Sequence, residues 1–236
     1  MQFSQESTFL YLTAGDHARN KLFVVPIPDT PGESTTHPSF STKYFTPQPL
    51  THNGAVSALQ ILPNEKLIFS RSSLQGPNDV FVIRGLRELE ADFINAQGEF
   101  KWKGKPEQVT RFTEKALVGK TLRPPEDFYF EGAEGKKVHG YVVKPYGWKE
   151  GDKRKWPGLL LIHGGMSAAL ANPIYVPYAE EFTGPQGAWD DQWSTRWNPN
   201  VFSHQEYFVV AINPTGSTTF GQGSFPSILA CAEQQL

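Results

Sequence analysis

The chain has 236 residues and a formal net charge of −2, so its composition supplies no basic field that would attract nucleic acid or anionic lipid. Its single cysteine, Cys231, excludes an intramolecular disulfide framework, and no spacing of cysteine and histidine indicates a metal site. We therefore expect no metal or other cofactor, no nucleic-acid partner and no membrane partner.

The amino-terminal residues carry no visible export signal. Residues 1–8 are polar and lack both the basic and the apolar region of a signal peptide. Apolar runs elsewhere are far shorter than the roughly 20 residues of a membrane span. The aromatic content of 13%, together with 21 glycines and 19 prolines, favours short strands and loops over long helices.

Two strand pairs recur in the first hundred residues. Residues 8–12 resemble residues 66–70, and residues 21–25 resemble residues 79–83, with a spacing of 58 positions in both cases. A recurring strand pair is typical of the blades of a β-propeller, although a small β-sandwich with accidental similarity is the alternative. The chain has room for about two blades, whereas closure of a propeller needs four to eight.

Shorter signals complete this first region, for which we predict a partial β-propeller over residues 1–105. Residues 26–49 are rich in proline and threonine and would connect the two strand pairs. Residues 55–61 would add an inner strand, and Pro63-Asn64-Glu65 a turn. Residues 104–125 form a charged, mixed connector, which we interpret as the domain boundary.

The next region, residues 106–222, begins with the pattern of a hairpin. Residues 128–130 and 138–143 are strand-like and flank the turn-forming stretch 131–137. Residues 159–163 form a short, wholly apolar strand, which we expect to be covered on both faces. Asn198 as N-cap and Pro199 at the first helical position predict a short helix.

Residues 207–213 then predict another buried strand. Hairpin, strand, helix and strand follow in the order that opens an α/β-hydrolase sheet. The fold class that we predict is therefore the amino-terminal half of an α/β-hydrolase domain, preceded by a partial β-propeller and truncated.

Three stretches of sequence carry a family resemblance: residues 125–137, the run W-P-G-L-L-L-I-H-G-G at 156–165, and residues 185–222. The last contains P-Q-G-A-W, W-S-T-R-W-N-P and N-P-T-G-S-T. H-G-G alone would be weak evidence, but its combination with these motifs is highly specific. The chain resembles the prolyl oligopeptidase family of serine peptidases, and closely its fungal dipeptidyl-peptidase branch.

The resemblance implies a secreted enzyme in which a propeller caps an α/β-hydrolase domain. In this family a Ser-Asp-His triad cleaves peptides through an acyl-enzyme, and dipeptides leave from the amino terminus. The triad follows the strands described above, so all three members would fall beyond Gln222. No G-x-S-x-G motif occurs in the 236 residues, and we expect the chain by itself to be inactive.

One catalytic contribution follows from the resemblance. The turn after the 159–163 strand lies beside the acyl carbonyl in the family, where a backbone N–H helps to bind the oxyanion. Gly165 is the matching position, because glycine lets the backbone approach closely. The alternative is that Gly164 and Gly165 merely turn the chain.

Two segments depart from the family pattern. Residues 166–184 separate H-G-G from P-Q-G-A-W, and their removal would restore a continuous motif. The tail, residues 223–236, is also unlike the family. We interpret both as translated non-coding sequence, an insert and an aberrant tail.

Other polar and aromatic residues are predicted to have structural roles. We expect His163 to be a packing residue on its buried strand and Ser217 to stabilise a turn. Asp190 and Asp191 lack a further ligand for a metal. Arg196 is a weak candidate for a substrate contact. Trp189, Trp193 and Trp197 recur every four positions, which would align them on one helical face that fills the domain interface. Surface or loop positions are predicted for His17, His37, His52, His139 and His204, and no nucleophilic role for Ser167 and Ser224.

Two functional hypotheses remain from the sequence. The favoured one is a fragment of a dipeptidyl-peptidase-like serine peptidase that acts on peptides in its intact form. The alternative is a non-catalytic binding protein that combines propeller blades with half of a hydrolase sheet.

Overall fold

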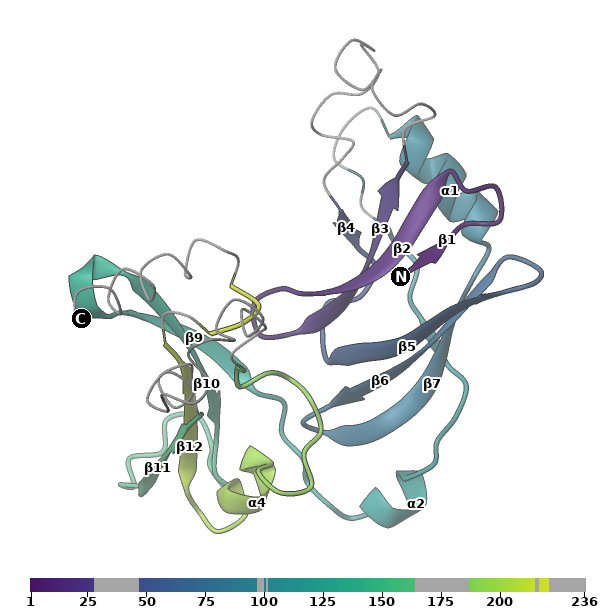
Figure 1. Cartoon of the computed structure of the whole chain (residues 1–236). Helices are drawn as coiled ribbons and strands as arrows, with labels where there is room; N and C mark the ends of the chain where they lie inside the picture. The colour runs from purple at the N-terminus through teal and green to yellow at the C-terminus, as the bar shows by residue number, and fades with distance from the viewer. Residues whose placement is uncertain (28–46, 97–99, 101, 164–186, 215–216, 221–236) are drawn as a thin grey trace, which may run out of the picture.

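The structure is a computed structural model that describes all residues except 28–46, 97–99, 101, 164–186, 215–216 and 221–236, and it is built mostly of β-strands (Figure 1). The described strands form two sheets, one of eight strands and one of four. Along the chain, the first sheet comes entirely before the second.

The eight-stranded sheet consists of two four-stranded antiparallel meanders. They meet at one parallel residue pair, Asn20 with Ala55. The first meander contains β1 (Gln2–Phe3), β2 (Phe9–Gly15), β3 (Asn20–Pro26) and β4 (Gln48–Pro49). The second contains β5 (Ala55–Leu62), β6 (Lys66–Ser73), β7 (Gly76–Arg84) and β8 (Glu107–Gln108).

The repeated strand pairs of the sequence are the central hairpins of these two meanders. The hairpin β2–β3 and the hairpin β6–β7 are both antiparallel, which confirms the four predicted strands. The predicted strand at 55–61 is confirmed as β5, and the predicted turn has positive φ at Asn64 (61°) and Glu65 (57°). Most of the predicted connection at 26–49 lies outside the described residues.

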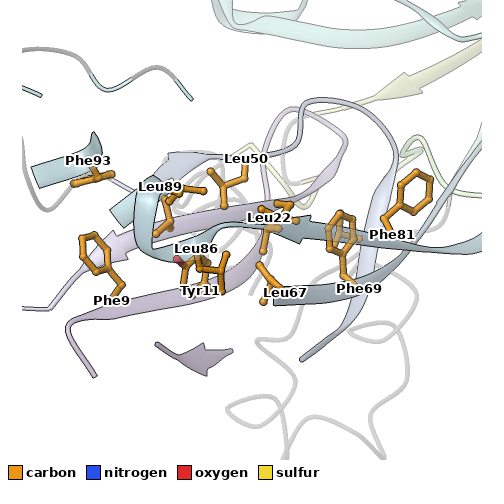
Figure 2. Packing of buried hydrophobic residues seen from close by; sticks show 13 residues of the cluster. Phe9, Tyr11, Leu22, Leu50, Leu67, Phe69, Phe81, Leu86, Leu89 and Phe93 are labelled. Atoms are coloured by element: carbon orange, nitrogen blue, oxygen red, sulfur yellow. The ribbon is translucent and has the colours of Figure 1, made fainter. Parts of the chain in front are cut away.

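An apolar core fills the space between the two meanders (Figure 2). It is closed at one end by helix α1 (Leu86–Asn95), which begins after Gly85 and buries one face of its turns. The helix contributes Leu86, Leu89 and Phe93, and Phe93 meets the ring of Phe9 edge-on at 5.6 Å. Side chains that alternate to the inner face of the strands supply most of the other core residues. Among these are Tyr11, Leu22, Val24, Leu67, Phe69 and Phe81.

The four-stranded sheet has the order β11-β12-β10-β9. Its strands are β9 (Glu126–Glu131), β10 (Lys137–Val143), β11 (Gly158–Ile162) and β12 (Phe208–Asn213). Strands β9 and β10 form the predicted hairpin around a 3-10 turn (Ala133–Gly135), β12 runs antiparallel to β10, and β11 runs parallel to β12. All four strands were predicted from the sequence.

Two short helices follow the first sheet in the chain, α2 (Glu114–Leu117) beside the second meander and α4 (Pro199–Ser203) beside the second sheet. Helix α2 belongs to the connector between the sheets, and α4 precedes β12. The predicted start of α4 is confirmed, because the side chain of Asn198 accepts a hydrogen bond from the backbone N–H of Asn200 at 2.9 Å and Pro199 is the first helical residue. No helix in the described part of the chain is long and apolar enough to cross a membrane.

The expectation that the apolar strand at 159–163 is covered on both faces was wrong. β11 is an edge strand among the described residues, with β12 on one side. Leu161 is buried, whereas Leu160 is 51% exposed and Ile162 is 79% exposed. A continuous apolar strand is buried on both faces only where helices or strands pack against both faces of its sheet. Among the described residues, nothing covers the face of β11 that carries Leu160 and Ile162.

Candidate functional site at the junction of the two sheets

The turn between β2 and β3 carries the first meander onto the four-stranded sheet. At its tip Ala18 is fully buried and has a positive φ of 58°. The carbonyl oxygen of Ala18 accepts hydrogen bonds from the Tyr141 hydroxyl at 2.7 Å and from the backbone N–H of Asp191 at 3.0 Å. The N–H of Ala18 donates to Oγ1 of Thr219 at 2.8 Å. This turn is therefore tied to three separate parts of the second half of the chain.

Beside this turn, Arg19 forms a bidentate ion pair with Asp127 on β9. Both N–O distances are 2.8 Å, the geometry in which a guanidinium matches a carboxylate best. Oδ1 of Asp127 also bonds Nε2 of His139 on β10 at 2.8 Å. Burial by itself would raise the pKa of Asp127, but the hydrogen bonds from Arg19 and His139, together with the charge of Arg19, outweigh it and lower that pKa. Asp127 is thus held as a carboxylate.

His139 is 2% exposed, and its partners fix its protonation state. Its Nδ1 lies 3.0 Å from Nδ2 of Asn213. The Asn213 side chain accepts from the backbone N–H of Trp189 through Oδ1 (2.7 Å) and donates through Nδ2 to the Trp189 carbonyl oxygen (2.9 Å). This orientation makes Nδ2 the donor, so Nδ1 of His139 must accept and Nε2 carries the ring proton. Burial lowers the pKa of His139, in keeping with the neutral ring.

These contacts place the side chains of Asp127, His139 and Asn213 near the carboxyl ends of β11 and β12 in the second sheet. Asn213 is the last residue of β12, and β11 ends beside it, because the two parallel strands pair Ile162 with Ile212. His139 pairs directly with Asn213 on the antiparallel neighbour β10. The turn of the first meander therefore sits at the carboxyl ends of the parallel strands, where α/β sheets bind their ligands.

A second set of contacts ties the segment before α4 to the second meander. Asp191 is 4% exposed, and its carboxylate accepts from the backbone N–H of Gly54 (2.8 Å) and from that of Leu74 (2.9 Å). The carbonyl oxygen of Leu74 in turn accepts from the side-chain amides of Asn198 (3.0 Å) and Asn200 (3.1 Å). We call Asp191, Asn198 and Asn200 the clasp, because all three hold the turns of the second meander.

The predicted helical face of tryptophans was wrong. Residues 187–198 are not helical, since their backbone groups bond to distant segments: the N–H of Trp189 to Asn213, and that of Trp193 to Oγ of Ser72 at 3.4 Å. Trp189 packs against the core of the second sheet, whereas Trp197 is 46% exposed and lies near the Arg196 guanidinium at 5.5 Å. Spacing by four residues was a coincidence here.

His163 and Ser217 lie together, with Nε2 of His163 3.0 Å from Oγ of Ser217. The serine hydroxyl donates to the carbonyl oxygen of Pro214 at 2.8 Å. Its proton is therefore committed to a backbone acceptor, and the histidine donates to it rather than withdrawing that proton. This is the arrangement of a structural turn and not of an activated nucleophile.

The remaining sequence candidates divide into three groups. Gly165, proposed for the oxyanion site, lies outside the described residues, as do His37, Ser167, Ser224 and Cys231. His17, His52 and His204 are on the surface, as expected. The expectation of a surface or loop position was wrong for His139. Its partner Asp127 lies on the predicted hairpin partner strand, so the hairpin register was the signal that could have brought the two together.

No group of three or more His, Cys, Asp or Glu side chains within the described ranges is placed to hold a metal ion. The junction instead offers an ion pair, a neutral histidine and backbone donors. Such a set can orient two parts of a protein and can line a site for a polar ligand.

Comparison with known proteins gives a consistent set of relatives. No family model matches the chain. The chain is 32% identical over 227 residues to a dipeptidyl-peptidase 5 of Trichophyton schoenleinii and to one of Arthroderma otae. Each alignment covers 94% of this chain and 24% of the relative, so the chain spans about a quarter of the length of the curated proteins it matches.

Solved structures share the fold at lower identity. The acylaminoacyl peptidase of Pyrococcus horikoshii matches with a TM-score of 0.56 and 15% identity, over 97% of this chain and 29% of that one. The dipeptidyl peptidase 4 of Porphyromonas gingivalis matches with a TM-score of 0.51 and 14% identity, over 89% and 23%. The chain therefore shares its overall fold with part of each of these structures.

Proposed function

Because this chain belongs to the prolyl oligopeptidase family, with fungal dipeptidyl-peptidases 5 among its relatives, we propose that it is part of a serine peptidase that releases dipeptides from the amino termini of peptides. The observation that carries the proposal is 32% identity maintained over 94% of the chain. The intact enzyme would act on peptides through an acyl-enzyme and would be secreted.

The two sheets are assigned within this proposal to two domains, at residues 1–105 and 106–222. Each meander of the first sheet would be one propeller blade, since blades are four-stranded antiparallel units packed face to face. β8 lies just past this boundary and pairs with β7. In the second sheet, an antiparallel hairpin followed by two parallel strands would be the start of an α/β-hydrolase sheet.

The junction suggests where the substrate would lie. The bidentate pair of Arg19 with Asp127 holds the β2–β3 turn of the first sheet near the carboxyl ends of β11 and β12. In an α/β-hydrolase the nucleophile and the oxyanion donors gather at that edge. The family role proposed for the backbone N–H of Gly165 belongs to the turn that directly follows β11.

We propose that the 236 residues alone do not hydrolyse peptides. They contain no G-x-S-x-G motif, and Ser217 donates its proton to a carbonyl oxygen. The attacking serine, the aspartate and the histidine of the triad would be supplied by sequence outside this chain. Purified chain should neither turn over dipeptide chromogenic substrates nor react with serine-directed phosphonates.

A chimera tests the function directly. The quarter of the Trichophyton schoenleinii dipeptidyl-peptidase 5 that matches this chain is replaced by this chain, once complete and once without residues 166–184. We expect release of amino-terminal dipeptides by at least one folded chimera, and only by the shorter one if residues 166–184 are translated non-coding sequence. Two folded chimeras without dipeptide release would contradict the proposed function.

A further inference from the structure

A cavity of about 470 Å³ lies between the second meander and the connector that contains α2. Its wall is formed by the end of the β6–β7 hairpin, by Gln108 on β8, and by residues 111–118 of the connector. This volume is within the range of sites that bind small molecules. No part of the junction cluster of Arg19, Asp127 and His139 contributes to its wall.

The wall contains a cation, Arg71, for which the described part of the chain supplies no hydrogen-bond partner. The Arg71 guanidinium lies over the ring of Phe81, with 4.1 Å between Cζ and the ring centroid. Within the described ranges, no hydrogen bond or ion pair involves its five N–H donors. Burial lowers the pKa of Arg71, and the charge of Asp191 only partly compensates. Burying a guanidinium whose N–H donors have no partner costs free energy, unless a ligand or water accepts hydrogen bonds from those donors.

The acidic groups near Arg71 are already committed elsewhere. Asp79, directly opposite on β7, accepts from Oγ1 of Thr110 (2.8 Å), from Nε2 of Gln108 (3.0 Å) and from the N–H of Phe112 (3.0 Å). Both oxygens of Asp191 bond backbone N–H groups in the clasp. Glu114 faces Arg111 at 3.6 Å on the exposed rim. Among the described residues, the N–H donors of Arg71 therefore remain open to the cavity.

The chemistry of the wall selects the ligand. A planar guanidinium binds a carboxylate through two parallel N–H donors, and its stacking on Phe81 fixes the plane of that fork. Leu117 and Val118 add apolar surface on the connector side, and Val118 is 74% exposed. The wall contains Asp79 and Glu114 as well as Arg71 and Arg111. A monoanion that binds the donors of Arg71 and carries an apolar group suits this wall better than a phosphate dianion does, because the dianion meets more repulsion from the acidic residues.

We propose that this cavity binds an organic carboxylate with an apolar substituent, held by Arg71. The carboxyl terminus of a short peptide and a free organic acid are the two sources of this chemistry. The inference does not depend on the proposed peptidase activity, because it concerns binding to a wall that contains no candidate nucleophile of the proposed reaction.

The test is a calorimetric titration of the purified 236-residue chain with four probes: Ala-Ala-Phe, its carboxyl-terminal amide, phenylacetate and inorganic phosphate. We expect the free tripeptide to bind at least about tenfold more tightly than the amide, which equals about 1.4 kcal/mol. Equal binding of phenylacetate and the tripeptide would identify a free organic acid as a sufficient ligand. Tighter binding of the tripeptide would identify a peptide.

Variants connect the binding to the cavity. Arg71→Gln should abolish the difference between acid and amide, and Arg71→Lys should reduce it, because lysine keeps the charge but not the fork. Leu117→Trp should block the cavity and weaken every probe. The matched control is Arg84→Gln, since Arg84 lies on β7, is paired with exposed Glu107 and does not line the cavity.

Circular dichroism and the thermal midpoint establish that each variant is folded, and the chimera described above offers the same cavity if the chain alone aggregates. The inference is overturned if the amide binds as tightly as the acid, if phosphate binds more tightly than either carboxylate, or if folded Arg71→Gln keeps the preference. Absence of binding by all four probes at millimolar concentration would also overturn it.

Discussion

Replacement of Asp191 by alanine should loosen the attachment of the second meander to the rest of the chain. The Asp191 carboxylate is 4% exposed and accepts two backbone N–H groups, from Gly54 at 2.8 Å and from Leu74 at 2.9 Å. Alanine removes both acceptors, and it leaves two buried N–H groups without a partner. Each such loss costs about 1–3 kcal/mol, so we expect a total of about 2–6 kcal/mol.

Hydrogen exchange of the two amides measures this effect locally. Because about 1.4 kcal/mol corresponds to a factor of ten, the amides of Gly54 and Leu74 should exchange about 30- to 20,000-fold faster in Asp191→Ala. Amides in the centre of the β6–β7 hairpin, such as that of Leu67, should change much less, because their partners lie within the sheet. Local measurement avoids the assumption that the two sheets unfold together.

Asp92→Ala is the matched control. Asp92 is an exposed carboxylate on α1, so its loss should leave both amides unchanged. If the exchange of Gly54 and Leu74 is the same in Asp191→Ala as in the unmodified chain, then the clasp does not hold the second meander, and the account of the junction given above is wrong.

Three further predictions follow from the same contacts. Burial keeps His139 neutral in the folded state, whereas the unfolded chain takes up a proton near pH 6.5. The free energy of unfolding should therefore fall by up to about 0.8 kcal/mol between pH 7.5 and pH 6.0. Urea unfolding at the two pH values should show that His139→Gln removes this loss. Burial raises the pKa of Asp190 from 3.8 to about 6, so its charge opposes folding at pH 7 and hardly does so below pH 4. Asp190→Asn should raise the unfolding free energy by up to about 3 kcal/mol at pH 7 and by only about 0.2 kcal/mol at pH 3.5, and an equal gain at both pH values would refute the cause. Ile162→Lys places a charge on an exposed position of the edge strand β11. It should reduce aggregation, measured by light scattering, and change the free energy of unfolding by at most about 0.5 kcal/mol. Unchanged aggregation would show that the β11 edge is not the surface through which the chain aggregates.

The elements that the sequence predicted are those with a strong local signal. Alternation and the 58-residue repeat located β2, β3, β6 and β7, and the pair Asn198-Pro199 located the start of α4. The strands β4 and β8 contain two residues each, which is too short for any periodicity to be visible. Their pairing depends on a longer neighbour that is already in place.

The residues of the junction could not be predicted, because their partners are distant in the sequence. Asp127 and Arg19 are separated by 108 positions, and Asp191 and Gly54 by 137. An isolated acidic pair such as Asp190-Asp191 has the same appearance in a solvated loop and in a buried clasp. Only the folded chain shows that one of these carboxylates faces two buried N–H groups while its neighbour has a raised pKa.

The junction also explains which of its positions depend on their side chains. Gly54, Leu74 and Ala18 take part through backbone N–H and C=O groups, which every residue except proline retains. Asp127, His139, Asp191 and Asn213 take part through side-chain atoms that no other residue type places identically. Ala18 carries an additional requirement, since it is fully buried with positive φ, where a larger or β-branched side chain would be strained. The attachment of the two sheets therefore depends on polar side chains that reach from one part to the other and on the small size of Ala18. These side chains are Arg19, Asp127, Asp191, Asn198 and Asn200.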